Sequence, residues 1–235
     1  MGWYYYDEYV PVAQKKAKAQ KQLEKLKKKG TLSPVVIEGR KIAKTWWGQA
    51  WCKNLESYAD FSNRIGRGSA YVKNGFVLDL QIEPGVLRGK VYGTSLYDIE
   101  IRIDPLKEQL KDDIAAAVGR RIDSIESFTS GAFPEAFRAL FLRQGTGLFP
   151  APKEIHMDCS CPDWADMCKH VAAVLYGVGA RLDDDPLLFF KLRGIDMGSF
   201  IKMSIDEKMK SLLKNAGAKT DRVMEDADIG GVFGV

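Results

Sequence analysis

The sequence predicts an α+β protein in which an antiparallel β-meander is covered by helices. Apolar and polar residues alternate over 76–83 and over 98–104, which is the period of strands with one buried face. Apolar residues recur at helical spacing before and after these stretches, so strands and helices are segregated along the chain. This segregation favours α+β over a parallel βαβ fold. A chain of 235 residues, 46% of them hydrophobic, can bury a sizeable core in one or two domains.

Residues 1–30 are predicted to be an aromatic and lysine-rich N-terminal arm. Eight lysines and three acidic residues give this segment a net charge of +5 and leave −1 for the rest of the chain, which totals +4. Like charges four residues apart oppose an isolated helix, so we expect a solvated arm or a frayed helix that ends at Gly30. The arm is either a solubilising tail or a contact for nucleic-acid phosphates, which release counterions when lysines bind them. The candidate phosphate contacts are Lys15, Lys16, Lys18, Lys21, Lys25, Lys27, Lys28 and Lys29.

Residues 31–143 are predicted to form the α+β domain, and its first helix follows Thr45. Thr45 is placed to cap the first turn. Trp47, Trp51 and Leu55 share one helical face and are expected in the core, whereas Trp46 is the more exposed ring. The alternative for these tryptophans is a platform on which nucleic-acid bases stack.

The meander is predicted over residues 69–103, with three or four strands. Asn74-Gly75 reads as a tight hairpin turn between a strand at 70–73 and the strand at 76–83, and Pro84-Gly85 as the next turn. Asp104-Pro105 then starts a covering helix. Further helices are predicted over 133–141, after residue 170, from Pro186, and over 206–215.

Four metal-ligating residues stand in two tight pairs late in the chain. Cys159, Cys161, Cys168 and His170 give the pattern C-x-C-x6-C-x-H. Three thiolates and one imidazole are a ligand set typical of tetrahedral zinc, and a reducing compartment favours metal over disulfides. The alternative is that they are buried small apolar residues with one satisfied histidine.

A closed Cys3His shell leaves no coordination position for water or substrate, so we expect one structural Zn²⁺ that fixes a small ββα zinc finger. The predicted organisation places this finger and its following helices in residues 144–195, and a C-terminal helical segment with an apolar tail in residues 196–235. The sequence shows no basic, apolar leader and no run long enough to span a bilayer. We therefore expect a soluble, cytoplasmic protein without membrane partners.

The stretch from Cys159 to His170 and the helix after it resemble the SWIM zinc finger, whose pattern is C-x-C, a variable spacer, C-x-H and a helix. The stretches at 46–51 and 185–196 and the closing Phe233-Gly234 look like those of standalone prokaryotic SWIM proteins. Those proteins are often encoded beside Swi/Snf-type helicase ATPases, and SWIM fingers are attributed DNA-binding and protein-interaction roles. The resemblance implies that Cys159, Cys161, Cys168 and His170 bind the zinc and that the partner is a Swi/Snf-type helicase ATPase, with DNA or RNA contact.

The predicted function is therefore that of a non-enzymatic zinc-binding interaction protein. The chain contains no P-loop, G-x-S-x-G or H-E-x-x-H motif. The alternative is a nuclease-like enzyme in which Asp158, Asp163 or Asp166 near the finger holds a second, hard metal. His156, three residues before the finger, is the one competitor of His170 as a zinc ligand, and it is expected to be an ordinary strand residue.

Overall fold

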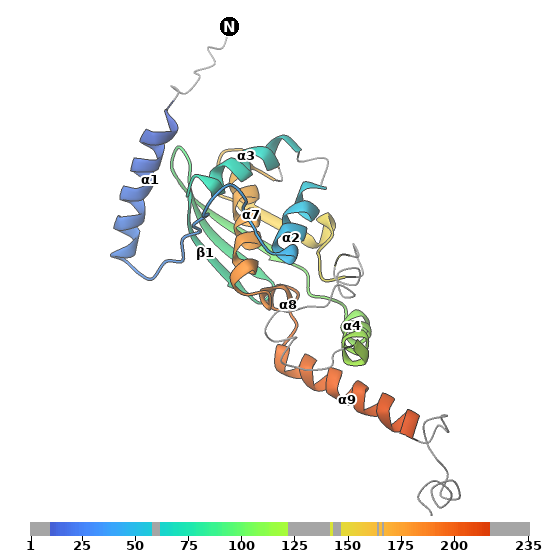
Figure 1. Ribbon diagram of the computed structural model, residues 1–235. Helices are drawn as coiled ribbons and strands as arrows, with labels where there is room; N and C mark the ends of the chain where they lie inside the picture. The colour runs from blue at the N-terminus through green and yellow to red at the C-terminus, as the bar shows by residue number, and fades with distance from the viewer. Residues whose placement is uncertain are drawn as a thin grey trace, which may run out of the picture.

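The computed structural model describes residues 10–57, 62–121, 142, 147–163, 165 and 167–216 (Figure 1). The described elements form an α+β fold, as predicted. In chain order they are α1 (Val12–Lys27), α2 (Trp46–Glu56), α3 (Ser62–Lys73), β1 (Val77–Glu83), β2 (Val86–Tyr92), β3 (Leu96–Ile103), α4 (Glu108–Arg121), the 3₁₀ turn η2 (Pro152–Glu154), β4 (Ile155–Cys159), α7 (Lys169–Asp184), α8 (Leu188–Leu192) and α9 (Met197–Ala216).

The four strands form one antiparallel sheet in the order β1-β2-β3-β4. Gly85, with φ of 68°, makes the predicted turn between β1 and β2, a backbone conformation that glycine adopts without strain. β4 comes from the predicted finger, and it pairs with β3 so that Ile155 lies opposite Ile103 and Cys159 opposite Ile99. The ββα unit of the finger therefore takes its first strand from the meander.

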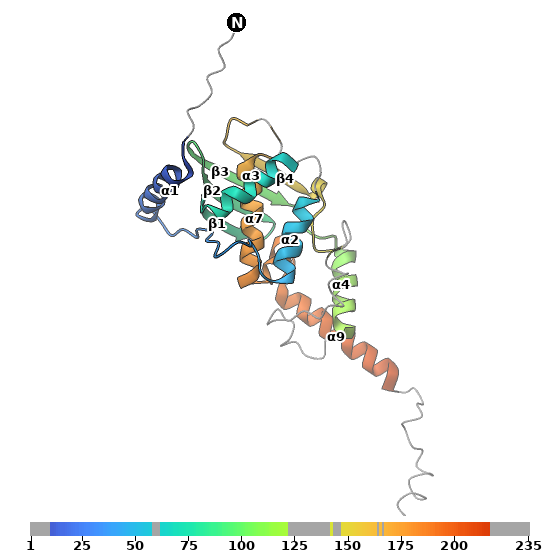
Figure 2. The same ribbon diagram turned by 45° about the horizontal axis from the view of Figure 1, so that its top comes forward.

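Helix α7 is the central element of the fold, between the sheet on one side and α2 and α3 on the other (Figure 2). Its residues from His170 to Gly179 are all buried, so it is enclosed on every side rather than along one stripe. Close approach to α3 is possible because Gly68 has no side chain: an added Cβ would lie 2.4 Å from that of Ala172. Small residues at this crossing thus fix how closely the two helices pack.

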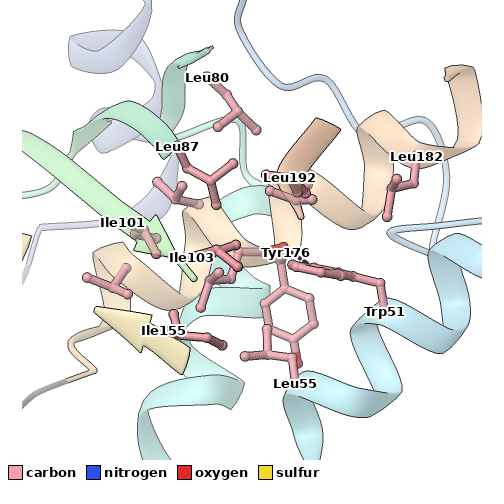
Figure 3. Close-up of a cluster of buried hydrophobic side chains, with 14 of the residues drawn as sticks. Trp51, Leu55, Leu80, Leu87, Ile101, Ile103, Ile155, Tyr176, Leu182 and Leu192 are labelled. Carbon is pink, nitrogen blue, oxygen red and sulfur yellow. Dashed lines mark hydrogen bonds between the residues drawn. The ribbon is translucent and has the colours of Figure 1, made fainter. Parts of the chain in front are cut away.

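The hydrophobic core lies between α7, α2 and the inner face of the sheet. Figure 3 shows Trp51 and Leu55 of α2 beside Tyr176 of α7, with Ile103 and Ile155 contributed by the strands. The predicted α+β domain and the predicted zinc-finger region thus share one core, which spans the predicted boundary at 143/144.

Helix α2 begins where predicted, and its first turn is tied to the end of α7. The Thr45 hydroxyl accepts a hydrogen bond from the backbone N–H of Gly48. Asp183 accepts hydrogen bonds from the backbone N–H groups of Lys44 and Thr45 and from the Thr45 hydroxyl. The Asp183 carboxylate therefore holds the two residues that precede α2 against the end of α7.

The predicted strand at 70–73 is wrong, because these residues end helix α3. Gly75 has φ of 73°, and its N–H donates to the carbonyl of Val72 while that of Phe76 donates to the carbonyl of Tyr71. These two bonds are the Schellman termination of a helix. Asn74-Gly75 is therefore a helix stop, and the meander within 69–103 has three strands.

Residues 12–27 form a regular helix, α1, rather than a solvated or frayed arm. Ala19 and Leu23, four residues apart, are buried, so one apolar stripe packs on the body while the lysines occupy the rest of the surface. Packing of this stripe outweighs the repulsion between like charges along the helix. The aromatic part of the predicted arm lies outside the described residues.

Helices α4 and α9 pack against each other to one side of the sheet (Figure 1). The helix predicted over 206–215 is part of α9, which begins at Met197. The helix predicted over 133–141 and the apolar tail after residue 216 lie outside the described residues. None of the helices in the described ranges has the length and apolar character that crossing a membrane requires.

Candidate metal centre

The structure brings all four predicted metal donors together. Cys159 ends β4, Cys161 lies in the turn after it, Cys168 caps α7, and His170 lies in the first turn of that helix. The three sulfurs and a ring nitrogen of His170 all lie within 4.8 Å of one another. The donor atoms of four residues that span Cys159 to His170 thus surround a single point.

The distances fit tetrahedral zinc. The Nδ1 atom of His170 lies 3.9 Å from Sγ of Cys159 and 3.8 Å from Sγ of Cys168. Zinc–sulfur bonds of about 2.3 Å and a zinc–nitrogen bond of about 2.0 Å place tetrahedral ligand atoms roughly 3.5–3.8 Å apart. One Zn²⁺ therefore fits between these donors, with Nδ1 as the histidine ligand atom.

Local hydrogen bonds hold the two pairs of donors in place. Ser160 extends the pairing of β4 with β3, since its N–H donates to the carbonyl of Asp98 and its hydroxyl accepts from the Asp98 N–H, both at 3.0 Å. Cys168 is the N-cap of α7, and its sulfur accepts a hydrogen bond from the Val171 N–H at 3.5 Å. The sheet edge thus fixes the first pair and the helix start fixes the second.

Cys168 is the donor most strongly held as a thiolate. The hydrogen bond from the Cys159 thiol is the main cause, and with His170 and the Val171 N–H it lowers the pKa of Cys168 to about 3 against the opposing effect of burial. Burial raises the pKa of Cys161. A divalent cation removes this asymmetry, because metal ligation requires all three sulfurs to be thiolates.

His170 is enclosed by aromatic rings from two other elements. Its ring centroid lies 4.5 Å from that of Tyr97 on β3 and 5.4 Å from that of Tyr71 on α3. Gly93 leaves room for it, because a Cβ there would lie 2.7 Å from Nε2 of His170. These rings fix the plane of the imidazole and hold Nδ1 toward the sulfurs. Sequence patterns did not indicate Tyr71, Tyr97 or Gly93, which lie far from the finger in the chain.

The Nε2 atom of His170 is buried and, within the described part of the chain, makes no hydrogen bond. With a metal on Nδ1, the ring is neutral and its proton sits on Nε2. His170 and Cys168 are buried, whereas Cys159 and Cys161 are half-buried. Four donors complete a tetrahedral shell, which is the arrangement of structural zinc sites.

Residues 153–178 match the family described as SWIM zinc finger. They span η2, β4, the ligand loop and the first part of α7. This matched segment, residues 153–178, is called the SWIM finger because of its similarity to that family. Its four metal donors are the Cys3His cluster, and this cluster is compatible with one bound zinc ion.

The chain is also similar to the protein named Uncharacterized protein Rv2102 of Mycobacterium tuberculosis (strain ATCC 25618 / H37Rv). The two are 33% identical over 156 residues, which is 65% of this chain and 56% of that protein. The match therefore spans a little over half of the relative's length. No solved structure matches the chain.

Of the other predicted candidates, those that the structure describes are not part of the donor cluster. His156 is exposed, and its Nε2 lies 2.8 Å from a carboxylate oxygen of Asp104. Asp163 forms an ion pair with Arg64 of α3 at 2.6 Å, and Asp158 is exposed on β4. Asp166 lies outside the described residues. Within the described ranges, the Cys3His cluster is the one group of three or more residues that could hold a metal ion.

The eight lysines predicted to contact nucleic acid all lie on α1 or just after it, but they are not equivalent. Lys15 is half-buried: its Nζ atom donates to the Tyr71 hydroxyl at 2.6 Å and lies 4.2 Å from the centre of that ring. Burial, and then Lys169 and Arg67, lower the pKa of Lys15. The other seven are exposed. Lys15 therefore anchors α1 to the ring that contacts His170, and it does not belong to the exposed basic surface.

Proposed function

We propose that this protein is a non-enzymatic interaction protein in which one structural zinc ion holds the SWIM finger, and that it serves as an accessory partner of a Swi/Snf-type helicase ATPase with contact to nucleic acid. The observation that carries the proposal is the complete Cys3His donor set, with all donor atoms within 4.8 Å. Four protein donors fill a tetrahedral zinc shell and leave no position for a reacting water. Zinc in this site therefore stabilises a surface instead of activating a substrate.

Nucleic-acid contact is supported by the exposed lysines of α1. Seven exposed ammonium groups on and just after one helix form a basic face of the kind that binds phosphates without regard to sequence. Lys15 holds this helix against α3, and Lys169, at the start of α7, lies 6.0 Å from the same Tyr71 ring. The basic helix therefore lies beside the finger.

The proposal of a helicase partner is based on the SWIM resemblance. It is tested by purifying the protein with its bound partners from the native organism. Affinity purification at low salt, followed by mass spectrometry and zinc analysis of the same sample, should yield a helicase-type ATPase and one zinc per chain. Repeated recovery of the protein alone would contradict the partnership. A variant that lacks the zinc ligand Cys161 (Cys161→Ser) should lose the partner if the finger forms the contact.

Nucleic-acid contact is tested separately by the salt dependence of duplex DNA binding. Changing the seven exposed α1 lysines to glutamine should flatten the plot of log K against log salt by up to about 6, at about 0.9 per lost phosphate contact. Lys15 stays unchanged, so that α1 remains docked. If the variant has the same salt slope as the wild type, α1 does not contact the DNA. Cleavage of DNA or RNA by the purified protein with Mg²⁺ or Mn²⁺ would instead support the nuclease alternative.

A further inference from the structure

A groove that none of the four metal donors lines lies between the segment before α2, helices α2 and α3, and Tyr176 of α7. Its volume is about 710 Å³, within the range of about 300–1,000 Å³ that is usual for ligand sites. Four cationic side chains line it, together with Trp46 and Glu56. The four cations are Arg40, Lys41, Lys53 and Lys73.

The cations of the groove are available to a ligand. All four are exposed, and no described residue forms an ion pair with any of them. They come from three different segments of the chain, so the fold concentrates positive charge here. The one carboxylate in the lining, Glu56, accepts a hydrogen bond from the Tyr176 hydroxyl at 2.9 Å. The lining thus carries a net charge of +3, from four cations and one carboxylate.

An aromatic surface lies beside this charge. Trp46 is half-buried, and its ring is held edge-on by that of Trp47, at 5.5 Å between centroids. The indole N–H of Trp47 donates to the carbonyl of Leu182 at 2.7 Å, which fixes the supporting ring. Ile42 and Ala50 add apolar surface to the lining. Trp46 is therefore a supported aromatic group in a basic groove.

We infer that this groove binds a single-stranded nucleic acid, with a base against Trp46 and the backbone phosphates on the surrounding lysine and arginine side chains. Grooves for single strands combine positive charge with aromatic rings on which bases stack. A duplex keeps its bases inside the helix, so a base reaches Trp46 only from a single strand. The inference rests on the proposed function for its ligand class, but α1 does not line the groove: α3 and α7 lie between α1 and α2 in both views (Figures 1 and 2).

Binding is measured by fluorescence anisotropy with a labelled oligothymidylate of about 12 nucleotides, within the site sizes of known single-strand grooves. The double variant Lys41→Gln/Lys53→Gln should weaken binding about tenfold and flatten the salt slope by about 1.4, at about 0.7 per lost phosphate contact. The matched control is Lys202→Gln/Lys214→Gln, which removes two exposed lysines from α9. Equal affinities of the two double variants would overturn the inference.

The role of the ring is tested by Trp46→Leu, with Trp46→Tyr as the conservative variant. The leucine variant should bind the oligothymidylate about tenfold more weakly, and the tyrosine variant should restore most of the affinity because it keeps a stacking face. Zinc content and circular dichroism establish that each variant is folded. If the leucine variant misfolds, a strand carrying 5-iodouracil is crosslinked to the wild type by light. Attachment to the peptide that contains Trp46 supports the inference, and attachment confined to other peptides overturns it.

A competition experiment tests whether the groove recognises a nucleic acid or binds any polyanion. Polyglutamate that displaces the oligothymidylate as well as unlabelled strand does, at equal charge, would show simple ion exchange and overturn the inference. The α1 glutamine variant distinguishes this inference from the proposed function. Loss of duplex binding in that variant, combined with groove variants that bind the single strand like wild type, would leave the proposed function standing and reject the groove.

Discussion

The ammonium group of Lys15 on α1 donates a 2.6 Å hydrogen bond to the hydroxyl of Tyr71 on α3, 56 residues later. The Tyr71 ring packs edge-on against His170, whose Nδ1 atom faces the three cysteine sulfurs. The lysine-rich helix and the SWIM finger are thus joined through one tyrosine. Two parts of the chain that look independent in the sequence share a contact.

Loss of one zinc ligand should destabilise the whole body. We expect Cys161→Ser to lose stoichiometric zinc, because two thiolates and one imidazole no longer complete the shell. Zinc at 100 times its Kd stabilises a protein by about 2.7 kcal/mol, so Tm should fall by about 5–11 °C. Helix α7 is the central helix, so hydrogen exchange should rise beyond residues 155–182. The control Cys52→Ser should keep one zinc per chain, and one tight zinc in Cys161→Ser would show that the ligand set is wrong.

Removing the Lys15 ammonium should loosen α1 without affecting zinc. Lys15→Met keeps the side-chain length but loses the hydrogen bond to Tyr71 and the contact with its ring, together worth roughly 1–2 kcal/mol. Amide exchange in residues 12–27 should therefore accelerate about tenfold. The exposed neighbour Lys18, changed to Met, is the matched control. Equal exchange rates in the two variants would mean that Lys15 does not hold the helix.

A methyl group at position 93 should disturb the histidine ligand. The added Cβ of Gly93→Ala would lie 2.7 Å from both Nε2 of His170 and Cε2 of Tyr97, so the imidazole must shift. Changes around a metal ligand typically lower affinity 10–100-fold, and we expect about tenfold in a chelator competition. Gly66→Ala on α3 is the control, since a Cβ there meets nothing within 4 Å. Unchanged zinc affinity in Gly93→Ala would show that the rings do not position His170.

The four thiols should fall into two classes. Burial, followed by Glu56, raises the pKa of Cys52 to about 12, and the thiolate is the form that iodoacetamide attacks. Native zinc-bound protein at pH 8 should therefore take up no label, and chelation of zinc should expose three sites. Cys52 should react only after denaturation or as the pH rises from 9 toward 12. If Cys52 is labelled at pH 8 as fast as a free thiol, burial does not protect it as predicted.

The sequence predicted the metal donors and much of the fold because their signals are local. Two pairs of donors, each one residue apart, specify a metal site whatever surrounds them, and alternating apolar residues predict strands. Asn74-Gly75 misled because the same dipeptide serves a hairpin turn and a helix end. Tertiary packing decides between the two structures. Because Gly68 has no side chain, α3 can pack as a helix on Ala172 of α7.

The surroundings of the donors could not be predicted for the same reason. Tyr71, Tyr97 and Gly93 enclose His170 from α3 and from the end of the β2–β3 hairpin, and no short pattern links them to the finger. The lysine run predicted a free arm because its charges oppose a helix. Burial of Ala19 and Leu23 and the Lys15 contact outweigh that repulsion.

Zinc-edge X-ray absorption of the purified protein tests most directly whether the zinc shell is closed. We predict one zinc per chain with three sulfur atoms at about 2.3 Å, one nitrogen at about 2.0 Å and no oxygen ligand. A zinc with an oxygen ligand, or with fewer than three sulfurs, would contradict a purely structural role of the metal.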